Sequence, residues 1–307
     1  MFSPEWLALR EPADAAARSA SLAESLVRAR PHDEPDEPIR VLDLAAGTGA
    51  NARYLADRWP REQHWLLMDV DATLLALVPE RLSTWAGRSG RVVSSDEHGV
   101  RMTGTGRPEI RVATRRVDLA VLDDRAVFAN RDLVTASALL DLVSESWLRA
   151  LAARCRDAGV AALFALTYDG TIECTPNEPE DRMIRDLVNC HQRTDKGFGP
   201  ALGPDAVAVA ERCFVGEGFQ VRREPSDWQL PPAMRELQRE LIDGWARAAI
   251  EAAPAQGAAI DRWRARRLAH VDEGRSHIVI GHEDLAAGAV TSPARAASAP
   301  RTSSARH

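Results

Sequence analysis

The segment from Val41 to Asn51 (Val-Leu-Asp-Leu-Ala-Ala-Gly-Thr-Gly-Ala-Asn) constrains the fold more than any other part of the chain. A short apolar run ends in a turn with two glycines, Gly47 and Gly49, and a helical pattern begins directly after it. Glycine lets a backbone turn tightly and approach a ligand closely, and the free amides at a helix start bind ligand groups. This order predicts a β-strand, a ligand-binding turn and a helix, as in the first half of a βαβ unit.

A second apolar run, residues 64–70, contains an acid, Asp69, twenty residues beyond Gly49. An acid at the end of the second strand of such a unit is placed to accept hydrogen bonds from ribose hydroxyls. The alternative is a tight strand-to-helix turn that binds nothing. The acid at this spacing argues against that alternative and favours a ligand that contains a nucleoside.

The turn also fits a dinucleotide pattern, Gly47-x-Gly49-x-x-Ala52, so an NAD(P)-dependent oxidoreductase is an alternative. Asp43 distinguishes the two ligands, because it lies at the mouth of the first predicted strand, where a pyrophosphate would bind. A carboxylate facing that anion in a partly desolvated cleft is costly. S-adenosylmethionine carries no phosphate, and its sulfonium and ammonium groups would be attracted by Asp43. The electrostatics therefore favour the methyl donor.

The same residues resemble the first motif of class I S-adenosylmethionine-dependent methyltransferases, commonly Asp-x-Gly-x-Gly-x-Gly. Asp43, Gly47 and Gly49 match this motif, and Ala45 replaces its usual first glycine. Alanine adds one methyl group, which is tolerable unless the position needs a positive φ. The resemblance implies a Rossmann-like fold and S-adenosylmethionine as the cofactor.

Later segments resemble the next motifs of this family. Asp69 matches the acid that binds the ribose. Asp118 and Leu119, in Arg-Val-Asp-Leu, resemble the third motif, which implies that Asp118 accepts from the adenine amino group and that the Leu119 backbone meets the ring. The segment that ends at Ser137 resembles the fourth strand, which lies beside the methionine end of the donor. A surface carboxylate at a strand end is the alternative for Asp118.

Apolar runs alternate with helical patterns along the chain, which predicts an α/β fold with a mostly parallel sheet and helices on both faces. The family implies seven strands, the last a short antiparallel one that we expect in residues 277–282. We predict a helical N-terminal cap in residues 1–30, a methyltransferase domain in residues 38–285 and a disordered tail in residues 286–307. The tail is rich in Ala, Ser, Pro and Arg and has almost no large apolar side chain to bury.

Two inserts lie outside the family's pattern, and we expect them to bind the methyl acceptor. One is an irregular segment, residues 170–200, which follows the fifth strand at the sheet edge where α/β folds bind ligands. The other is a pair of helices predicted in residues 231–273. His191 is the candidate general base, Asp195 its orienting partner, and Tyr168 either stacks on the substrate or packs in the core. A surface loop whose polar side chains meet only water is the alternative.

The predicted first helix carries Arg10, Asp14 and Arg18 on one face. One interpretation is a pair of solvated ion pairs worth about 0.2–0.5 kcal/mol each. The other is a helix that closes over the donor, with Arg18 pairing with the methionine carboxylate. Asp141 interrupts an apolar run and is either a structural carboxylate or a contact to the donor amine. His282 is interpreted as structural.

Composition restricts the partners of the chain. The formal net charge is −6 and no Lys/Arg cluster alternates with aromatic residues, which argues against a nucleic-acid partner. No apolar run reaches the length of about 18 residues that spans a membrane, and the N-terminus lacks the pattern of a secretory signal. The four cysteines form no CxxC pair, so we expect reduced thiols in a cytoplasmic protein and no metal site.

The expected function is therefore methyl transfer from S-adenosylmethionine to an O, N or C atom of a small molecule. An NAD(P)-dependent oxidoreductase and a non-catalytic S-adenosylmethionine-binding protein are the alternatives. The sequence leaves the acceptor and the oligomeric state open.

Overall fold

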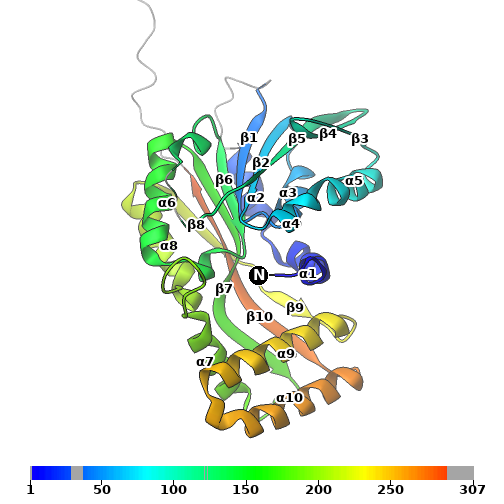
Figure 1. Cartoon of the computed structure of the whole chain (residues 1–307), viewed down its shortest axis with the longest axis vertical. Coiled ribbons are helices and arrows are strands. Elements are labelled where there is room, and N and C mark those ends of the chain that lie inside the picture. The colour runs from blue at the N-terminus through cyan, green and yellow to red at the C-terminus, as the bar shows by residue number, and fades with distance from the viewer. Residues whose placement is uncertain (1, 29–36, 121, 123, 289–307) are drawn as a thin grey trace, which may run out of the picture.

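The computed structural model describes residues 2–28, 37–120, 122 and 124–288. Its centre is a sheet in the order β3-β4-β5-β2-β1-β6-β7-β10-β8, with β9 paired to β10 (Figure 1). The strands β5, β2, β1, β6 and β7 are parallel to their neighbours within this group. Their bounds are β1 Ile39–Leu44, β2 Gln63–Asp69, β5 Arg107–Arg116, β6 Leu133–Ser137 and β7 Ala161–Thr175.

Antiparallel strands extend the sheet at both ends. The strand β10 pairs with β7, β8 and β9, and the hairpin of β3 and β4 pairs with β5. Their bounds are β3 Val92–Asp96, β4 Gly99–Gly104, β8 Gln220–Pro225, β9 Trp228–Leu230 and β10 His277–Gly288. Within the described residues, seven of the strands follow the order β5-β2-β1-β6-β7-β10-β8, so the predicted seven-stranded Rossmann-like α/β fold is confirmed.

Alternate residues of each central strand enter two different apolar cores. In β1, Ile39 and Val41 join the core on the side of α2, α3 and α5, whereas Leu42 and Leu44 join the core on the side of α6 and α8. This period of two is what a strand buried on both faces requires. The helix bounds are α2 Ala20–Arg28, α3 Ala50–Ala56, α4 Ala72–Ala76, α5 Val78–Arg88, α6 Glu145–Ala158 and α8 Ala206–Gly216.

The strands β7 and β10 run on past the other central strands and form the floor of a second lobe (Figure 1). Helices α7 (Asp181–Gln192), α9 (Arg235–Ala252) and α10 (Gly257–Asp272) cover this ribbon around a third apolar core. The two helices predicted in residues 231–273 are present. The prediction that residues 170–200 are irregular is wrong, because β7 continues to Thr175 and α7 follows, with its apolar side chains on one face.

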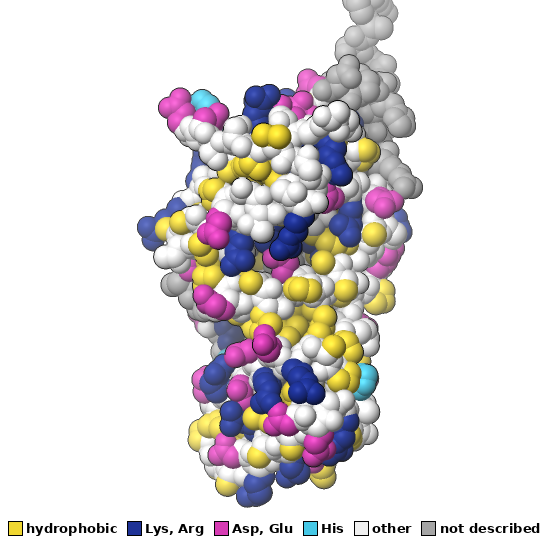
Figure 2. All heavy atoms as spheres, turned by 90° about the vertical axis from the view of Figure 1, so that its right-hand side faces the viewer, with side chains coloured by type: hydrophobic (Ala, Val, Ile, Leu, Met, Phe, Trp, Pro, Cys, Tyr) yellow, Lys and Arg dark blue, Asp and Glu magenta, His cyan; other side chains and the backbone are white. Residues whose placement is uncertain are grey.

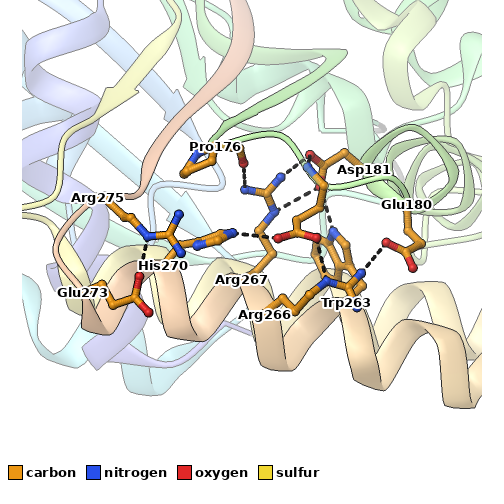
Figure 3. A network of polar contacts seen from close by, with 10 residues as sticks. Pro176, Glu180, Asp181, Trp263, Arg266, Arg267, His270, Glu273 and Arg275 are labelled. Atoms are coloured by element: carbon orange, nitrogen blue, oxygen red, sulfur yellow. Dashed lines mark hydrogen bonds and ion pairs between the residues drawn. The ribbon is translucent and has the colours of Figure 1, made fainter.

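A buried polar network fastens α10 to the turn that follows β7 (Figure 3). The fully buried guanidinium of Arg267 pairs with Asp181 and donates to the carbonyl of Pro176. His270 pairs with Glu178 at 2.7 Å, and Arg266 pairs with the same glutamate at 2.6 Å. The charges in this network are matched, so we assign it a structural role.

The N-terminal cap consists of two helices, α1 (Pro4–Ala17) and α2, and not of one continuous helix. Arg18 between them has an extended backbone, with φ −63° and ψ 144°. The carboxylate of Asp284 on β10 holds this junction, because it accepts from the amides of Ser19 and Leu166, both at 2.8 Å. Helix α1 therefore lies at the waist between the two lobes (Figure 1).

The predicted tail begins too early. Residues 286–288 belong to β10, where Ala286 and Ala287 are buried and lie between β7 and β8. The prediction is wrong here because backbone pairing on both sides holds this part of the strand and needs no large side chain. Residues 289–307 of the predicted tail, and residues 29–30 of the predicted cap, lie outside the described residues. No helix in the described ranges is long and apolar enough to span a membrane.

Candidate functional site

The turn after β1 lies where the order of the parallel strands reverses, with β2 on one side of β1 and β6 on the other. Ligands of open α/β sheets bind in the crevice at this point. Gly47 and Gly49 have φ values of +54° and +79°, and α3 begins directly after Gly49. The predicted strand, turn and helix are therefore present at the expected place.

Ala45 also has a positive φ, +53°, which is a conformation that strains an alanine. Replacement of the family's usual glycine by Ala45 therefore costs backbone energy. Ala138, directly after β6, and Leu166 on β7 have similar φ values, +53° and +55°. A residue with a Cβ in this region costs about 1–2 kcal/mol. Such strain gathers at functional sites, and the three residues follow one another across the carboxyl edge of the sheet.

Asp69, the candidate ribose acid, is buried at the end of β2 and bonds to two backbone amides. Its Oδ2 accepts from Gly47 at 2.8 Å and its Oδ1 accepts from Asp71 at 2.9 Å. Asp71 in turn caps α4 by accepting from the Thr73 amide at 2.8 Å. Each carboxylate oxygen has a second lone pair, so Asp69 can hold the turn and still accept from a hydroxyl.

Asp43 is fully buried on β1 and faces α3. The side-chain amide of Asn51 donates to Asp43 Oδ1 at 2.6 Å and to Thr135 Oγ1 on β6 at 3.1 Å. The other oxygens of this pair, Asp43 Oδ2 and Asn51 Oδ1, are buried without a hydrogen-bond partner. Burial raises the pKa of the Asp43 carboxyl to about 7, although the Asn51 hydrogen bond and the nearby Arg18 charge lower it.

Arg18 is a buried cation beside this carboxyl. Its guanidinium lies 4.0 Å from the centroid of the Tyr54 ring, and its Nε atom has no hydrogen-bond partner. Burial lowers the pKa of Arg18, while the charges of Asp284 and Asp43 raise it. Arg10 pairs with Asp14 at 2.9 Å, and both side chains are largely buried. The interpretation of Arg10, Asp14 and Arg18 as solvent-exposed ion pairs is therefore wrong. No described acid lies within ion-pair distance of Arg18, so the expected pair with Asp14 is absent.

Together these groups are complementary to a zwitterion. Asp43 Oδ2 and Asn51 Oδ1 are acceptors suited to an ammonium group, and Arg18 is a donor suited to a carboxylate. Buried polar atoms without partners are rare in folded proteins and call for an explanation. An α-amino-acid group bound at the turn would satisfy all three.

Helix α1 packs directly on the glycine turn. A Cβ atom at Gly47 would lie 3.1 Å from Leu7 Cδ1, and Glu11 forms an ion pair of 2.7 Å with Arg53 of α3. Arg53 also donates to the Thr48 carbonyl at 2.6 Å, which ties α1 to the turn itself. Figure 2 shows apolar side chains gathered at this waist, on the side of the molecule that carries α1.

The candidate adenine contacts lie at the end of β5, next to Asp69. The amide of Val117 donates to the Asp69 carbonyl at 2.9 Å, and Asp118 and Leu119 follow. Asp118 is exposed and accepts from the Ala120 amide at 2.9 Å, whereas the Leu119 carbonyl accepts from Trp147 Nε1 at 2.6 Å. A cavity of about 240 Å³ opens beside this loop; it is lined by Ala120, Leu122, Ser144, Ser146, Trp147, Ala150 and Phe198. Half-buried Ser137 ends β6.

The expected pair of His191 and Asp195 does not form. His191 lies at the end of α7, where its Nε2 is 2.9 Å from the Glu251 carboxylate of α9. Asp195 accepts from the amides of Gly197 and Gly199 at 2.7 and 3.1 Å, so it shapes its own loop. The prediction failed because a short-range backbone bond is available to an aspartate that precedes glycines. Neither side chain contacts a described residue of the glycine turn.

Tyr168 is buried, and it belongs to a cluster that the sequence did not reveal. Its hydroxyl donates to Asn189 Oδ1 at 2.7 Å, and its ring is 6.2 Å from that of His282. His282 also lies 5.2 Å from the ring of Trp228, and Arg10 lies 5.2 Å above that ring. Asp141, an acid within an apolar run, is buried nearby. The sequence pointed to these residues one by one and did not indicate that they lie together.

No protein-family model matches the chain, and no curated protein matches it. Solved structures do align. Cyclopropane synthase MmaA2 from Mycobacterium tuberculosis is 12% identical with a TM-score of 0.41, over 87% of this chain and 82% of that one. Mycolic acid cyclopropane synthase CmaA1, complexed with SAH and CTAB, is 11% identical with a TM-score of 0.43, over 87% and 82%. Geranyl diphosphate methyltransferase, in complex with SAM, is 10% identical with a TM-score of 0.40, over 88% and 85%. These distant likenesses carry no conclusion about activity.

Proposed function

We propose that the chain is an S-adenosylmethionine-dependent methyltransferase that acts on a small molecule. The observation that carries this proposal is the set of unpartnered buried groups at the turn, Asp43 Oδ2, Asn51 Oδ1 and Arg18 Nε. They fit the ammonium and carboxylate of the methionine end of the donor. Asp69 would accept from the ribose, and Asp118 and the Leu119 backbone would meet the adenine.

The bound donor would supply a methyl group on a cationic sulfur. The residues of the chain would bind and orient the donor: Asp43 attracts its positive charges, and Arg18 holds its carboxylate. Helix α1 would keep water out of the crevice, since it already packs on Gly47. Positioning and exclusion of water supply much of the acceleration of such transfers, and a base is needed only where the acceptor must lose a proton.

Two alternatives make different demands on the same residues. A dinucleotide would bring a pyrophosphate to the buried Asp43 carboxyl, an unfavourable contact. One observation favours a non-catalytic protein that binds S-adenosylmethionine: the Leu7 side chain packs closely against Gly47 of the glycine turn. Binding and turnover together separate these functions.

The test is calorimetry with S-adenosylmethionine, S-adenosylhomocysteine, NAD⁺ and NADP⁺. We expect binding of the first two ligands, and loss of most of it in the Asp43→Asn variant. The matched control is Asp186→Asn, which removes the same charge from the exposed surface of α7. Binding of a dinucleotide without S-adenosylhomocysteine would contradict the proposal. Transfer of a labelled methyl group into a small-molecule extract separates an enzyme from a binding protein.

A further inference from the structure

Five residues from five elements meet on the side of β7 and β10 that α1 covers. They are Arg10 of α1, Asp141 of the short helix η2 (Leu140–Leu142), Tyr168 of β7, Trp228 of β9 and His282 of β10. The four residues other than Arg10 are between 3% and 7% exposed. Aromatic contacts join the rings of Tyr168, His282 and Trp228, and the charge of Arg10 acts on both Asp141 and His282. We name this set the β10 cluster.

The β10 cluster holds two acceptor atoms suited to a ligand, beside the unpartnered donor Trp228 Nε1. Asp141 Oδ1 is buried and has no hydrogen-bond partner. His282 Nδ1 lies 3.0 Å from the Ile280 carbonyl, which can only accept, so Nδ1 carries the proton and Nε2 presents its lone pair. Burial lowers the pKa of His282 to about 3, with Arg10 acting in the same direction, so the ring is neutral at physiological pH.

The one cation of the β10 cluster forms its ion pair outside the cluster. Arg10 is paired with Asp14 at 2.9 Å, which matches its charge. Burial raises the pKa of Asp141 to about 6, against the effects of its own amide, of Arg10 and of the Tyr168 amide. Its Oδ1 atom is buried without a partner, and the ionised form of such a carboxyl costs stability unless a ligand offsets its charge.

The β10 cluster adjoins the donor groups through α1. Asp14 lies between them, because its carboxyl interacts with Arg10 on one side and with Arg18 on the other. The end of α1 is fastened to Asp284, two residues beyond His282 on β10. A ligand in the β10 cluster and the methionine end of a donor at Asp43 would thus lie under the same helix.

We propose that the β10 cluster holds the methyl acceptor and that this acceptor is a small amine whose nitrogen faces Asp141. The inference rests on the proposed function. An ammonium supplies the positive charge that the Asp141 site lacks and a second N–H for His282 Nε2, whereas an alcohol supplies one donor and no charge. The face of Tyr168 also attracts cations, as the Trp228 ring does with Arg10.

The reaction that follows from this arrangement balances. An acceptor bound as the ammonium first gives one proton to the Asp141 carboxylate. The neutral amine then forms the new N–C bond with its lone pair, and the sulfur of the donor keeps the electron pair of the broken S–C bond. The methylated nitrogen leaves as an ammonium, and Asp141 releases its proton to solvent. Asp141 is thus the proposed proton acceptor, and His282 is a positioning residue that orients the second N–H.

The test uses the full chain saturated with S-adenosylhomocysteine and two matched pairs of probes: 2-phenylethylamine with 2-phenylethanol, and propylamine with propanol. We expect calorimetry to show at least one amine binding about ten-fold or more tightly than its alcohol, as a charged hydrogen bond implies. Asp141→Asn should remove that preference without changing the affinity for S-adenosylhomocysteine. His282→Gln, which replaces the ring acceptor with a carbonyl oxygen, should retain most of the preference. Asp186→Asn is the control for the lost charge.

Equal binding of amines and alcohols, or of neither, to the wild-type complex would overturn the inference and leave the proposed function standing. The same holds for an Asp141→Asn variant that keeps the preference for amines. If Asp141→Asn does not fold, the comparison of the probe pairs in the wild-type chain decides alone. A wild-type chain that does not bind S-adenosylhomocysteine would overturn the proposed function, and the inference with it.

Discussion

The amide of Gly47 donates a hydrogen bond of 2.8 Å to Oδ2 of Asp69. The acid expected to bind the ribose therefore also holds the turn on which the donor would lie. Since both Asp69 oxygens accept backbone amides, substitutions of this residue act on the shape of the site as well as on ligand contacts.

Asp69→Ala should weaken binding of S-adenosylhomocysteine by about 1–3 kcal/mol, because charge-assisted hydrogen bonds to the ribose are lost. It should also lower Tm, since the Gly47 and Asp71 amides lose their acceptor. Asp69→Asn keeps one acceptor oxygen, so its affinity and its Tm should lie between those of the wild type and of Asp69→Ala. Calorimetry and thermal unfolding check this, with Asp186→Ala as the control. Unchanged affinity in Asp69→Ala would remove this residue from the donor site.

Asp43 should make the free energy of unfolding depend on pH. Its folded pKa of about 7 lies above its usual value of 3.8, so the folded state binds the proton more tightly. The stabilisation that follows from this raised pKa is fully present below about pH 4 and is lost as the pH rises towards 7. Relative to wild type, Asp43→Asn should gain stability by up to about 1.4 kcal/mol per pH unit between pH 5 and 7. Urea unfolding at pH 5, 6 and 7 measures the difference, and a constant difference would contradict it.

The affinity for the donor should rise with pH over the same range. An ammonium group binds the ionised Asp43 carboxylate better than the protonated acid, so binding of S-adenosylhomocysteine should tighten from pH 6 to pH 8. In Asp43→Asn the affinity should be weaker and flat over this range. Calorimetry at three pH values tests both statements. An identical slope in the variant would mean that another group titrates.

Helix α1 should control how fast the donor enters and leaves. The Glu11–Arg53 ion pair and the Leu7 contact with Gly47 hold this helix on the turn. Glu11→Gln weakens that hold, so the rate constants for association and dissociation of S-adenosylhomocysteine should both rise, with a smaller change in Kd. Stopped-flow tryptophan fluorescence follows the rates, and Glu5→Gln, an exposed change on the same helix, is the control. Unchanged rates would show that α1 does not gate the site.

Ala45→Gly should stabilise the fold by about 0.5–1 kcal/mol. Relief of the left-handed alanine, about 1–2 kcal/mol, is partly offset by the greater backbone freedom of glycine in the unfolded chain. Ala138→Gly, at the same φ of +53° on the next strand, should behave alike. The denaturation midpoint is the measurement. A loss of stability in both variants would mean that the alanine methyl groups contribute packing that exceeds the strain.

The strand, the glycine turn and the position of Asp69 could be predicted because the sequence pattern that specifies them is local. Asp43, Gly47 and Gly49 lie in one short segment, and one βαβ unit brings Asp69 to the same edge. Asn51 stood in the same segment, but its bridge from Asp43 to Thr135 depends on the pairing of β1 with β6, which local patterns do not specify.

The β10 cluster could not be predicted in the same way. His282 meets Trp228 and Tyr168 only because β10 pairs with both β9 and β7. Long-range antiparallel pairing of this kind leaves no periodic trace in the sequence beyond the strands themselves. Helix α7 was different: Met183, Ile184, Leu187 and Val188 have helical spacing and pack in the third apolar core, so its pattern was present but overlooked.

The ribbon of β7 and β10 has a mechanical consequence. One strand, β10, pairs with β8 through its last six residues and with β9 near its start, so the same backbone crosses both lobes. Because a continuous strand joins the two lobes, no flexible linker lies between them at this point. Hinge closure of one lobe onto the other would break the hydrogen bonds of the sheet. If the proposed acceptor binds at the β10 cluster, acceptors of different size would have to be accommodated by side chains along the ribbon and by the N-terminal helix. Point substitutions at these positions would then alter the choice of substrate while the sheet stays rigid.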